Sequence, residues 1–241
     1  MEPPASDVLT VWERGLRQSL GERALSLLAL ADEPLESPGD LPAGARDAAL
    51  LRIRRRLAGE RIDAVVDCQT CGEQLDVTLA VADLLAEPHA RAPAGASIAL
   101  EGYRVDARLP TSADLATLRD CVEIETGARR LLQRCTLLAL HEGEPVEVDD
   151  LPEHVLAALD AALAAADPGG DTTLAVACPA CGAENRPLFD IPTILWSEIQ
   201  QLARNTMLDV HELARAYGWD ERAVLSLSPA RRRFYLEAVG T

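Results

Sequence analysis

The sequence predicts an α+β fold that is mainly helical. Apolar residues make up 48% of the chain and aromatic residues only 3%, so leucine, alanine and valine must fill most of the interior, which favours helices. A short strand–turn–strand block occurs twice, around residues 68–72 and again around 178–182. We therefore predict a discontinuous pair of β-hairpins, a large α+β segment inserted between them, and helices on both sides.

The first segment, residues 1–60, is predicted to be helical because its apolar residues recur at helical spacing. Ser6 is the expected N-cap of the first helix, and Gly21 is expected to break the helical pattern. A helix over 46–58 follows a loop rich in proline and glycine. We expect the charged residues of 52–56 to form the solvent-facing side of that helix.

Residues 61–86 and 172–191 are predicted to form the two hairpins. In the first, a strand over 62–66 leads into the turn, and an alternating apolar pattern over 75–81 predicts the return strand. In the second, a short strand is expected at 188–191 after the turn.

The inserted segment, residues 87–171, is predicted to hold a short sheet followed by about three helices. Alternating patterns predict strands at 97–100 and 103–109. The expected helices lie at 112–122, 128–140 and 153–166.

The last segment, residues 192–241, is predicted to be helical throughout. Pro192 begins the longest helix of the chain, and Gly218 is its expected C-terminal stop. Asp220 and Ser228 are the expected N-caps of two shorter helices.

The repeated turn carries the clearest chemical signal, because each copy contains a CxxC pair followed by glycine. Cys68, Cys71, Cys178 and Cys181 supply the four thiolates of a tetrahedral structural zinc site, and neither pair can complete that site alone. We therefore predict one structural Zn²⁺ per chain, held by two hairpins that together resemble a zinc ribbon. The alternatives are a redox dithiol and four small buried residues, but a redox motif needs only a single CxxC at the start of a helix.

The other candidate residues form no recognisable catalytic group. Cys121 and Cys135 lie on predicted helices without a nearby cysteine and are expected to be small buried residues. The segment 211–215 lacks the second histidine of an HExxH zinc site, and no glycine-rich phosphate loop occurs. We expect neither enzymatic activity nor a small-molecule substrate.

The charge of the chain limits its partners. All 23 basic residues are arginine, 39 residues are acidic, and the formal net charge is -16. Such a chain repels nucleic-acid phosphates, so nucleic acid is not an expected partner. No secretory signal or membrane-spanning run is evident, and CxxC pairs suit a reducing compartment, so we expect a cytoplasmic protein.

Several segments together resemble phage-type proteins known as T4-family baseplate hub assembly chaperones or baseplate proteins. The matching segments are 9–15, 22–25, 44–48, 108–115, 178–182, 189–191, 196–199, 210–219 and 231–237. The resemblance implies a structural or assembly protein of a contractile tail or tail-like injection particle. It further implies that the partners are other baseplate or tail-hub proteins.

The C-terminal segment is the expected site of partner contact. Tyr217, Trp219, Arg232 and Tyr235 belong to residue types that carry much of the energy of protein interfaces. In a competing interpretation, the three aromatic residues form the core of the terminal helices, and the arginines of 231–233 lie on the solvent face of the last helix. Both interpretations remain open from the sequence alone.

Two other functional classes also remain open from the sequence. One is a zinc-ribbon regulator that binds nucleic acid, which salt-sensitive DNA binding would reveal. The other is a CxxC thiol oxidoreductase, which turnover in a dithiol reduction assay would reveal.

Overall fold

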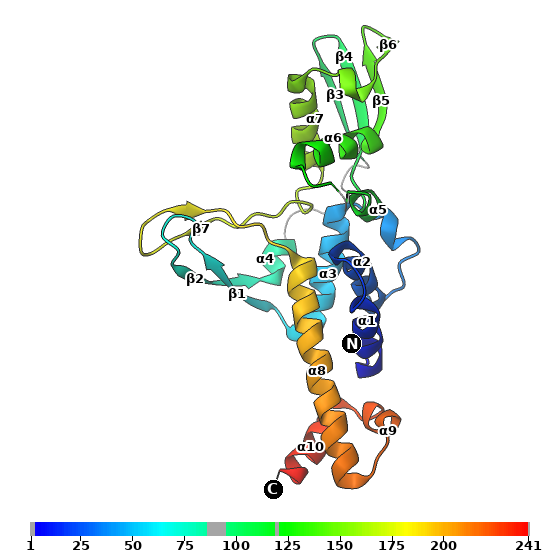
Figure 1. The fold of residues 1–241 in the computed structure, drawn as a ribbon, viewed down its shortest axis with the longest axis vertical. Helices are drawn as coiled ribbons and strands as arrows, with labels where there is room; N and C mark the ends of the chain where they lie inside the picture. Colours follow the sequence, from blue (N-terminus) through cyan, green and yellow to red (C-terminus); the bar gives the residue numbers. More distant parts are fainter. Residues whose placement is uncertain (1–2, 86–94, 119–120, 241) are drawn as a thin grey trace.

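The computed structural model describes residues 3–85, 95–118 and 121–240. A central helical body carries a sheet unit at one end, an arm that projects sideways, and a distal lobe at the other end (Figure 1). The prediction of a mainly helical α+β fold is confirmed. None of the helices in these ranges combines the length and the apolar character that crossing a membrane requires.

The body is a bundle of helices whose apolar faces meet in one core. Leu27, Leu50 and Ile199 are among its fully buried side chains. The helices are α1 (Ala5–Gly15), α2 (Leu20–Leu27), α3 (Ala43–Ala58) and the first half of α8 (Ile191–Tyr217). Short 3-10 turns lie between α2 and α3, at η1 (Leu28–Leu30) and η2 (Pro38–Asp40).

Two predictions about the first helices are wrong. Helix α1 begins at Ala5, so Ser6 lies inside it and does not cap it. Ser19 instead caps α2 through a reciprocal capping box with Glu22, which places Gly21 inside this helix. The capping box satisfies amide groups that a helix start otherwise leaves unpaired, and it outweighs the low helix propensity of one glycine.

Helix α1 crosses α8 at Gly15, where the two helices approach very closely. A Cβ atom on Gly15 would lie 2.2 Å from Cη2 of Trp196, so only glycine fits against this indole. The guanidinium of Arg23 lies 4.7 Å from the centre of the Trp196 ring, and its Nε donates to the carbonyl of Gly15 at 2.8 Å. Trp196 is thereby held by α1 and α2 together.

The arginines of 52–56 do not all face solvent, contrary to the prediction. Arg54 is only 5% exposed, and its Nε and Nη2 donate to the carboxylate of Glu198 on α8 at 3.0–3.2 Å. Its Nη1 donates to the carbonyl of Gly59 at 2.8 Å. Burial of this charge is tolerated because the guanidinium has both a carboxylate and a carbonyl partner.

The sheet unit contains a four-stranded antiparallel sheet in the order β3-β4-β5-β6, with α7 packed against β3 and β4. Val105, Val155 and Leu159 are fully buried in a core of its own, separate from that of the body. The strands are β3 (Gly95–Leu100), β4 (Tyr103–Arg108), β5 (Thr136–His141) and β6 (Glu144–Pro145). The helices are α5 (Ser112–Ala116), α6 (Ile124–Cys135), η4 (Val148–Asp150) and α7 (Glu153–Ala166).

The predicted helices at 112–122 and 128–140 are wrong in their extents. Helix α5 stops at Ala116, and α6 begins at Ile124, so Gly127 lies within it. At Thr136 the chain passes directly from α6 into β5, which pairs with β4. A run of leucines fits a helix or a strand equally well, and pairing with β4 decides between them here.

Asp114 ties the sheet unit together at its junction with the body. It is 1% exposed, and its carboxylate accepts hydrogen bonds from Arg108, from Nε of Arg134 at 3.1 Å, and from the amide of Thr111 at 3.0 Å. The bonds from Arg108 and Thr111 hold the pKa of Asp114 well below its ordinary value of 3.8. Pro42, just before α3, forms a β-bridge with Thr111, which joins this network to the body.

A second junction lies at the start of α3. Oδ2 of Asp167, which follows α7, accepts from the amide of Gly44 at 2.9 Å. A carboxylate is favoured at a helix N-terminus, where the first amide groups have no partner within the helix. A Cβ on Gly44 would lie 2.0 Å from Oδ1 of Asp167, so glycine is required for this contact.

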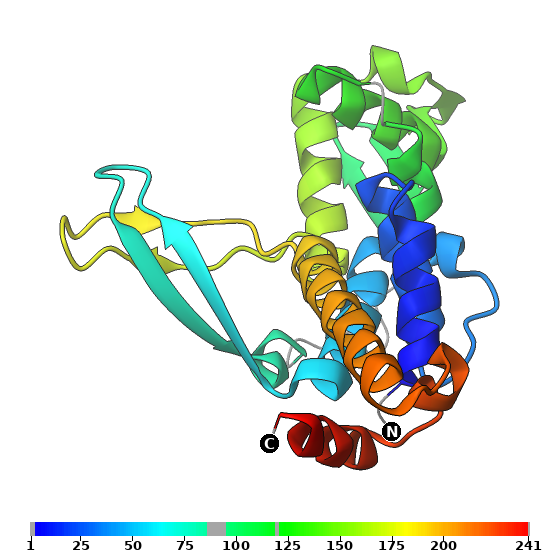
Figure 2. The same cartoon turned by 60° about the horizontal axis from the view of Figure 1, so that its bottom comes forward.

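The arm consists of two antiparallel hairpins that lie together and project away from the body (Figures 1 and 2). The first hairpin has β1 (Arg61–Asp67) and β2 (Gln74–Ala80), followed by α4 (Val81–Leu85); the second has β7 (Val176–Ala177) and β8 (Glu184–Asn185). The predicted strand at 188–191 is wrong, since only an isolated bridge between Thr173 and Leu188 occurs there.

The distal lobe is made by the second half of α8 with α9 (Glu221–Leu225) and α10 (Pro229–Val239). The predicted ends of these helices are confirmed. Gly218 ends α8 in the left-handed conformation, with φ of 69°, and the carboxylate of Asp220 accepts from the amide of Ala223 at 2.7 Å. Ser228 caps α10 through the amide of Arg231.

Replacing Gly15 by alanine should lower the free energy of unfolding by about 1–3 kcal/mol, because the added methyl group overlaps Trp196. Gly21→Ala is the matched control. That position is helical and open, so the same change should stabilise the protein by about 0.5–1 kcal/mol. Urea denaturation of both variants measures the difference, and equal effects at the two sites would contradict the close contact.

Asp114 should make stability depend on pH in the acid range. The pKa of Asp114 is lower in the native state than in the unfolded state. Its carboxylate therefore contributes fully to the free energy of unfolding above the unfolded-state pKa, and this contribution is lost as pH falls through the native pKa. Asp114→Asn should therefore cost about 1–3 kcal/mol at pH 7, and the difference from the unmodified chain should shrink progressively below about pH 4. Asp76→Asn, an exposed site on β2, is the control for denaturation at both pH values.

Candidate metal centre

The first CxxC turn closes the β1–β2 hairpin at the tip of the arm. The amide of Cys68 donates to the carbonyl of Glu73 at 2.8 Å, and the amide of Gly72 donates to the carbonyl of Cys68 at 2.9 Å. Gly72 has φ of 75°, a conformation that favours glycine, which explains why the residue follows the CxxC pair.

The second CxxC turn repeats this geometry between β7 and β8. The amides of Cys178 and Gly182 make the corresponding bonds, to the carbonyls of Ala183 and Cys178, both at 2.9 Å. Gly182 has φ of 73°. The two turns therefore have the same backbone shape, as the repeated sequence block indicates.

The structure brings the four predicted ligand sulfurs together. All four Sγ atoms lie within 4.8 Å of one another. The separation is 3.8 Å between Cys68 and Cys181 and 3.7 Å between Cys71 and Cys178. A tetrahedron with metal–sulfur bonds of about 2.3 Å, as in zinc thiolate sites, has edges of about 3.8 Å. The donor set thus fits one tetrahedral metal ion.

Two of the thiols, Cys68 and Cys71, have strongly different pKa values. Amide groups of Cys71 and Thr70 donate toward the sulfur of Cys68 and lower the pKa of this thiol to about 6. The amide of Glu73 also favours the thiolate of Cys71, but the neighbouring sulfurs, with Cys181 first among them, outweigh it and raise the pKa of Cys71 to about 12. Four sulfurs within 4.8 Å of one another cannot all be thiolates unless a cation balances their negative charge.

Asn185 is a functional residue that the sequence analysis missed. Its side chain is buried, its Oδ1 accepts from the amide of Gln69 at 2.9 Å, and its Nδ2 lies 3.6 Å from the sulfur of Cys68. The amide group therefore joins the two turns and orients one ligand. Leu75 occupies the matching position of the first hairpin, and this difference between the two copies is the signal that could have identified Asn185.

The aromatic residues proposed for partner contact lie together in the distal lobe. The rings of Tyr217 and Trp219 stack with centroids 4.8 Å apart, and Tyr235 packs edge-on against Trp219 at 4.9 Å. Tyr217 is 41% exposed, and Phe234, which contacts Tyr235, is 65% exposed. The cluster therefore fastens α10 to the end of α8 and still presents aromatic surface to solvent.

Arg232 is buried, whereas both interpretations of the sequence placed it at the surface. It is 9% exposed, and Nη1 lies 3.9 Å from the carboxylate of Asp209 on α8. The pKa of Asp209 is raised by burial, which the charge of Arg232 partly offsets. The guanidinium therefore holds α10 against α8 and does not contribute to the exposed aromatic surface. The ring of Phe234 on the last helix is mostly exposed.

The other two cysteines lie away from the metal centre. Cys135 is fully buried at the end of α6, as predicted, and Cys121 is half-buried. His211 is exposed on α8.

The fold and the site define a mainly helical scaffold with a candidate four-cysteine metal centre on a projecting arm. Residues 29–196 match the model of a protein family described as "T4 bacteriophage base plate protein". The match covers well over half of the chain, and the chain therefore belongs to this family of phage tail structural proteins. It includes both CxxC turns and ends at Trp196, so most of α8 and all of α9 and α10 lie outside it. No curated protein and no solved structure shows significant similarity.

The reduced protein should bind one equivalent of added Co²⁺ or Zn²⁺ at the sulfur cluster, which the visible absorption of Co²⁺ can follow. A Cys68→Ser, Cys178→Ser double variant should lose this site. Asn185→Leu should retain one equivalent but bind it about 10–100-fold more weakly, because the support to Cys68 is lost. Cys121→Ser, outside the cluster, should leave the titration unchanged, and any Co²⁺ binding that survives the double variant would contradict this site.

Proposed function

We propose that this protein is a non-enzymatic structural or assembly component of the baseplate, or of its hub, in a contractile phage tail or tail-like particle. The observation that carries the proposal is the family match over residues 29–196. The acidic surface, with a net charge of -16, favours protein partners over nucleic acid, and the proposed partners are other baseplate or tail-hub proteins.

Zinc is the proposed metal, and its role is to stabilise the arm. The described residues of 61–86 and 172–191 would form the two halves of one zinc-ribbon-like unit, and those of 87–171 the unit inserted between them; residues 86–94 and 119–120 lie outside the described ranges. The buried hydrophobic cluster of the arm tip, within the described residues, consists of Cys68, Leu75 and Cys178. A core this small cannot stabilise four strands in water, so the metal would supply most of the stability of the arm.

The distal lobe is the proposed partner surface. Besides the rings of Tyr217 and Phe234, α8 exposes Met207 by 40% and Leu208 by 53%. Aromatic and methionine side chains are enriched where proteins bind one another. A single exposed apolar side chain is normal on a protein surface, but several large ones on one lobe indicate an interaction site.

The two other functional classes have less support. A nucleic-acid-binding ribbon would need basic residues beside the turns, and the exposed Arg186 is paired there with Glu184 at 2.7 Å. A thiol oxidoreductase would pair the two cysteines of one CxxC segment, whereas the short sulfur separations join cysteines of different segments.

Co-expression of the tagged chain with baseplate and tube proteins from the same genome tests the proposal. The chain should copurify with at least one of them and contain one zinc per chain by metal analysis. Presence in finished particles would indicate a permanent subunit, whereas presence only in intermediates would indicate an assembly chaperone.

In the same experiment a Tyr217→Ala, Phe234→Ala double variant should reduce copurification about tenfold or more, as expected when interface aromatics are truncated. Leu20→Ala is the control, because Leu20 is 57% exposed on α2 and lies outside the distal lobe. Absence of any association with baseplate proteins would overturn the proposed function, and zinc-free reduced protein would overturn the metal assignment alone.

A further inference from the structure

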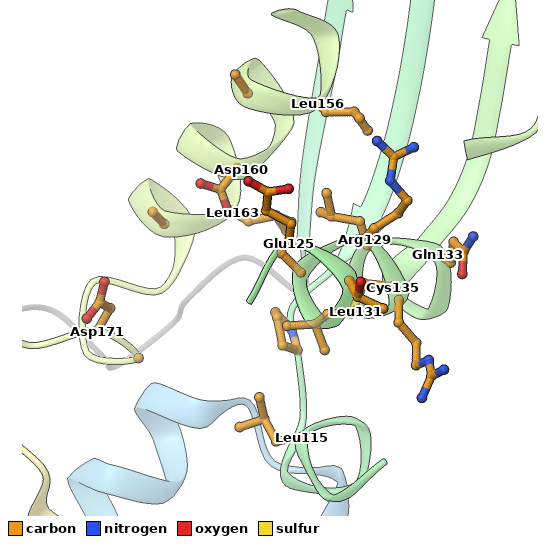
Figure 3. Close-up of a pocket in the computed structure, with 18 of the residues that line it drawn as sticks. Leu115, Glu125, Arg129, Leu131, Gln133, Cys135, Leu156, Asp160, Leu163 and Asp171 are labelled. Carbon is orange, nitrogen blue, oxygen red and sulfur yellow. The ribbon is translucent and has the colours of Figure 1, made fainter. Parts of the chain in front are cut away.

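A groove of about 950 Å³ lies in the sheet unit, between α6 and α7, and reaches the start of α3 (Figure 3). Leu115, Leu132, Leu156 and Leu163 contribute apolar walls. This volume is at the upper end of the range for specific binding pockets, so the groove can accept several side chains of another molecule.

Helix α7 lines the groove with one continuous face. Ala157 and Ala164 are exposed on it, while Leu156 and Leu163 beside them are turned into the core and are each 7% exposed. Alanine side chains allow another backbone to approach α7 closely, and they leave the groove open along the helix.

The rim of the groove is acidic. Glu125 on α6, Glu153 and Asp160 on α7, and Asp171 beyond it all line the opening, and Figure 3 shows Glu125 and Asp160 on facing walls. Within the described ranges, none of these four carboxylates makes an ion pair or a side-chain hydrogen bond. By contrast, Asp149, which also lines the groove, already has Arg129 at 3.7 Å and Gln133 at 2.8 Å.

The positive charge available at the rim is smaller than the negative charge. Arg130 is the remaining guanidinium of the lining, compared with four carboxylates that have no partner among the described residues. The groove therefore repels phosphates and attracts cations. Large apolar side chains are also exposed where α6 begins, since Val122 is 95% exposed and Ile124 is 89% exposed.

We propose that this groove binds a segment of another tail protein that carries arginine or lysine residues beside apolar side chains. The apolar residues of that segment would enter between the leucines and alanines, and its cations would meet the four rim carboxylates. Such charge complementarity speeds association and selects the partner, and it weakens as salt increases. The inference rests on the proposed function for the class of partner, but it concerns a surface distinct from the distal lobe.

The test uses the full chain and two sets of probes: purified tail proteins from the same genome, and overlapping peptides that span their sequences. Binding to labelled peptides is followed by fluorescence anisotropy at low and high ionic strength. At least one peptide with both basic and apolar residues should bind, and more weakly at high salt.

Two variants address the groove. Ala157→Trp fills it without changing charge, and a Glu125→Arg, Asp160→Arg double variant reverses its rim. Each should weaken the peptide about tenfold or more, equivalent to about 1.4 kcal/mol. A Glu13→Arg, Glu144→Arg double variant makes the same change in net charge at exposed sites outside the groove lining, and it should bind like the unmodified chain. Circular dichroism confirms that each variant is folded.

The inference is overturned if no peptide binds, or if peptides bind Ala157→Trp and the reversed variant as tightly as the unmodified chain. If intact tail proteins bind regardless of the groove but depend on Tyr217 and Phe234, the proposed function stands and the groove has no part in it. If no intact tail protein binds at all, both the proposed function and the groove inference are overturned.

Discussion

The contact between Gly15 and Trp196 is the constraint on which the arrangement of the molecule depends. Helix α8 contributes to the core of the body with its first half, receives the chain from the arm at its start, and carries the distal lobe at its end. Its direction is set where the indole lies against the glycine of α1 and beneath the guanidinium of Arg23. The bond between Arg54 and Glu198, two residues beyond Trp196, fixes this part of α8 against α3. The first contact joins segments 9–15, 22–25 and 196–199, which the resemblance to baseplate proteins singled out separately.

Stability is distributed unevenly among the parts. The body and the sheet unit each bury their own set of aliphatic side chains. The carboxylate of Asp167 joins the two units through the amide of Gly44, and the Pro42–Thr111 bridge joins the network of Asp114 to the body. The arm tip has no comparable core. A four-cysteine metal centre at that position would order the arm locally and would leave the rest of the protein able to fold without it.

Local signals in the sequence predicted much of the fold. The hairpins with their CxxC turns, the start of α8 and the caps at Gly218 and Asp220 follow from residues close together in the chain. The prediction errors occur where contacts between residues far apart in the chain determine the local structure. Residues 136–141 became a strand because β4 is available to pair with them, and Arg54 is buried because Glu198, far along the chain, accepts its bonds. Asn185 escaped notice for the same reason, since its partners belong to the other hairpin.

The length of α8 has a consequence for how the protein can be placed among its neighbours. Its 27 residues span about 40 Å, and the helix is continuous from the body to the distal lobe. The sheet unit lies at the opposite end of the long axis from that lobe (Figure 1). Two neighbouring molecules that touched the two ends would never need to touch each other. The chain would then act as a spacer of set length, and shortening α8 by whole turns would draw the two neighbours together in steps of about 5.4 Å.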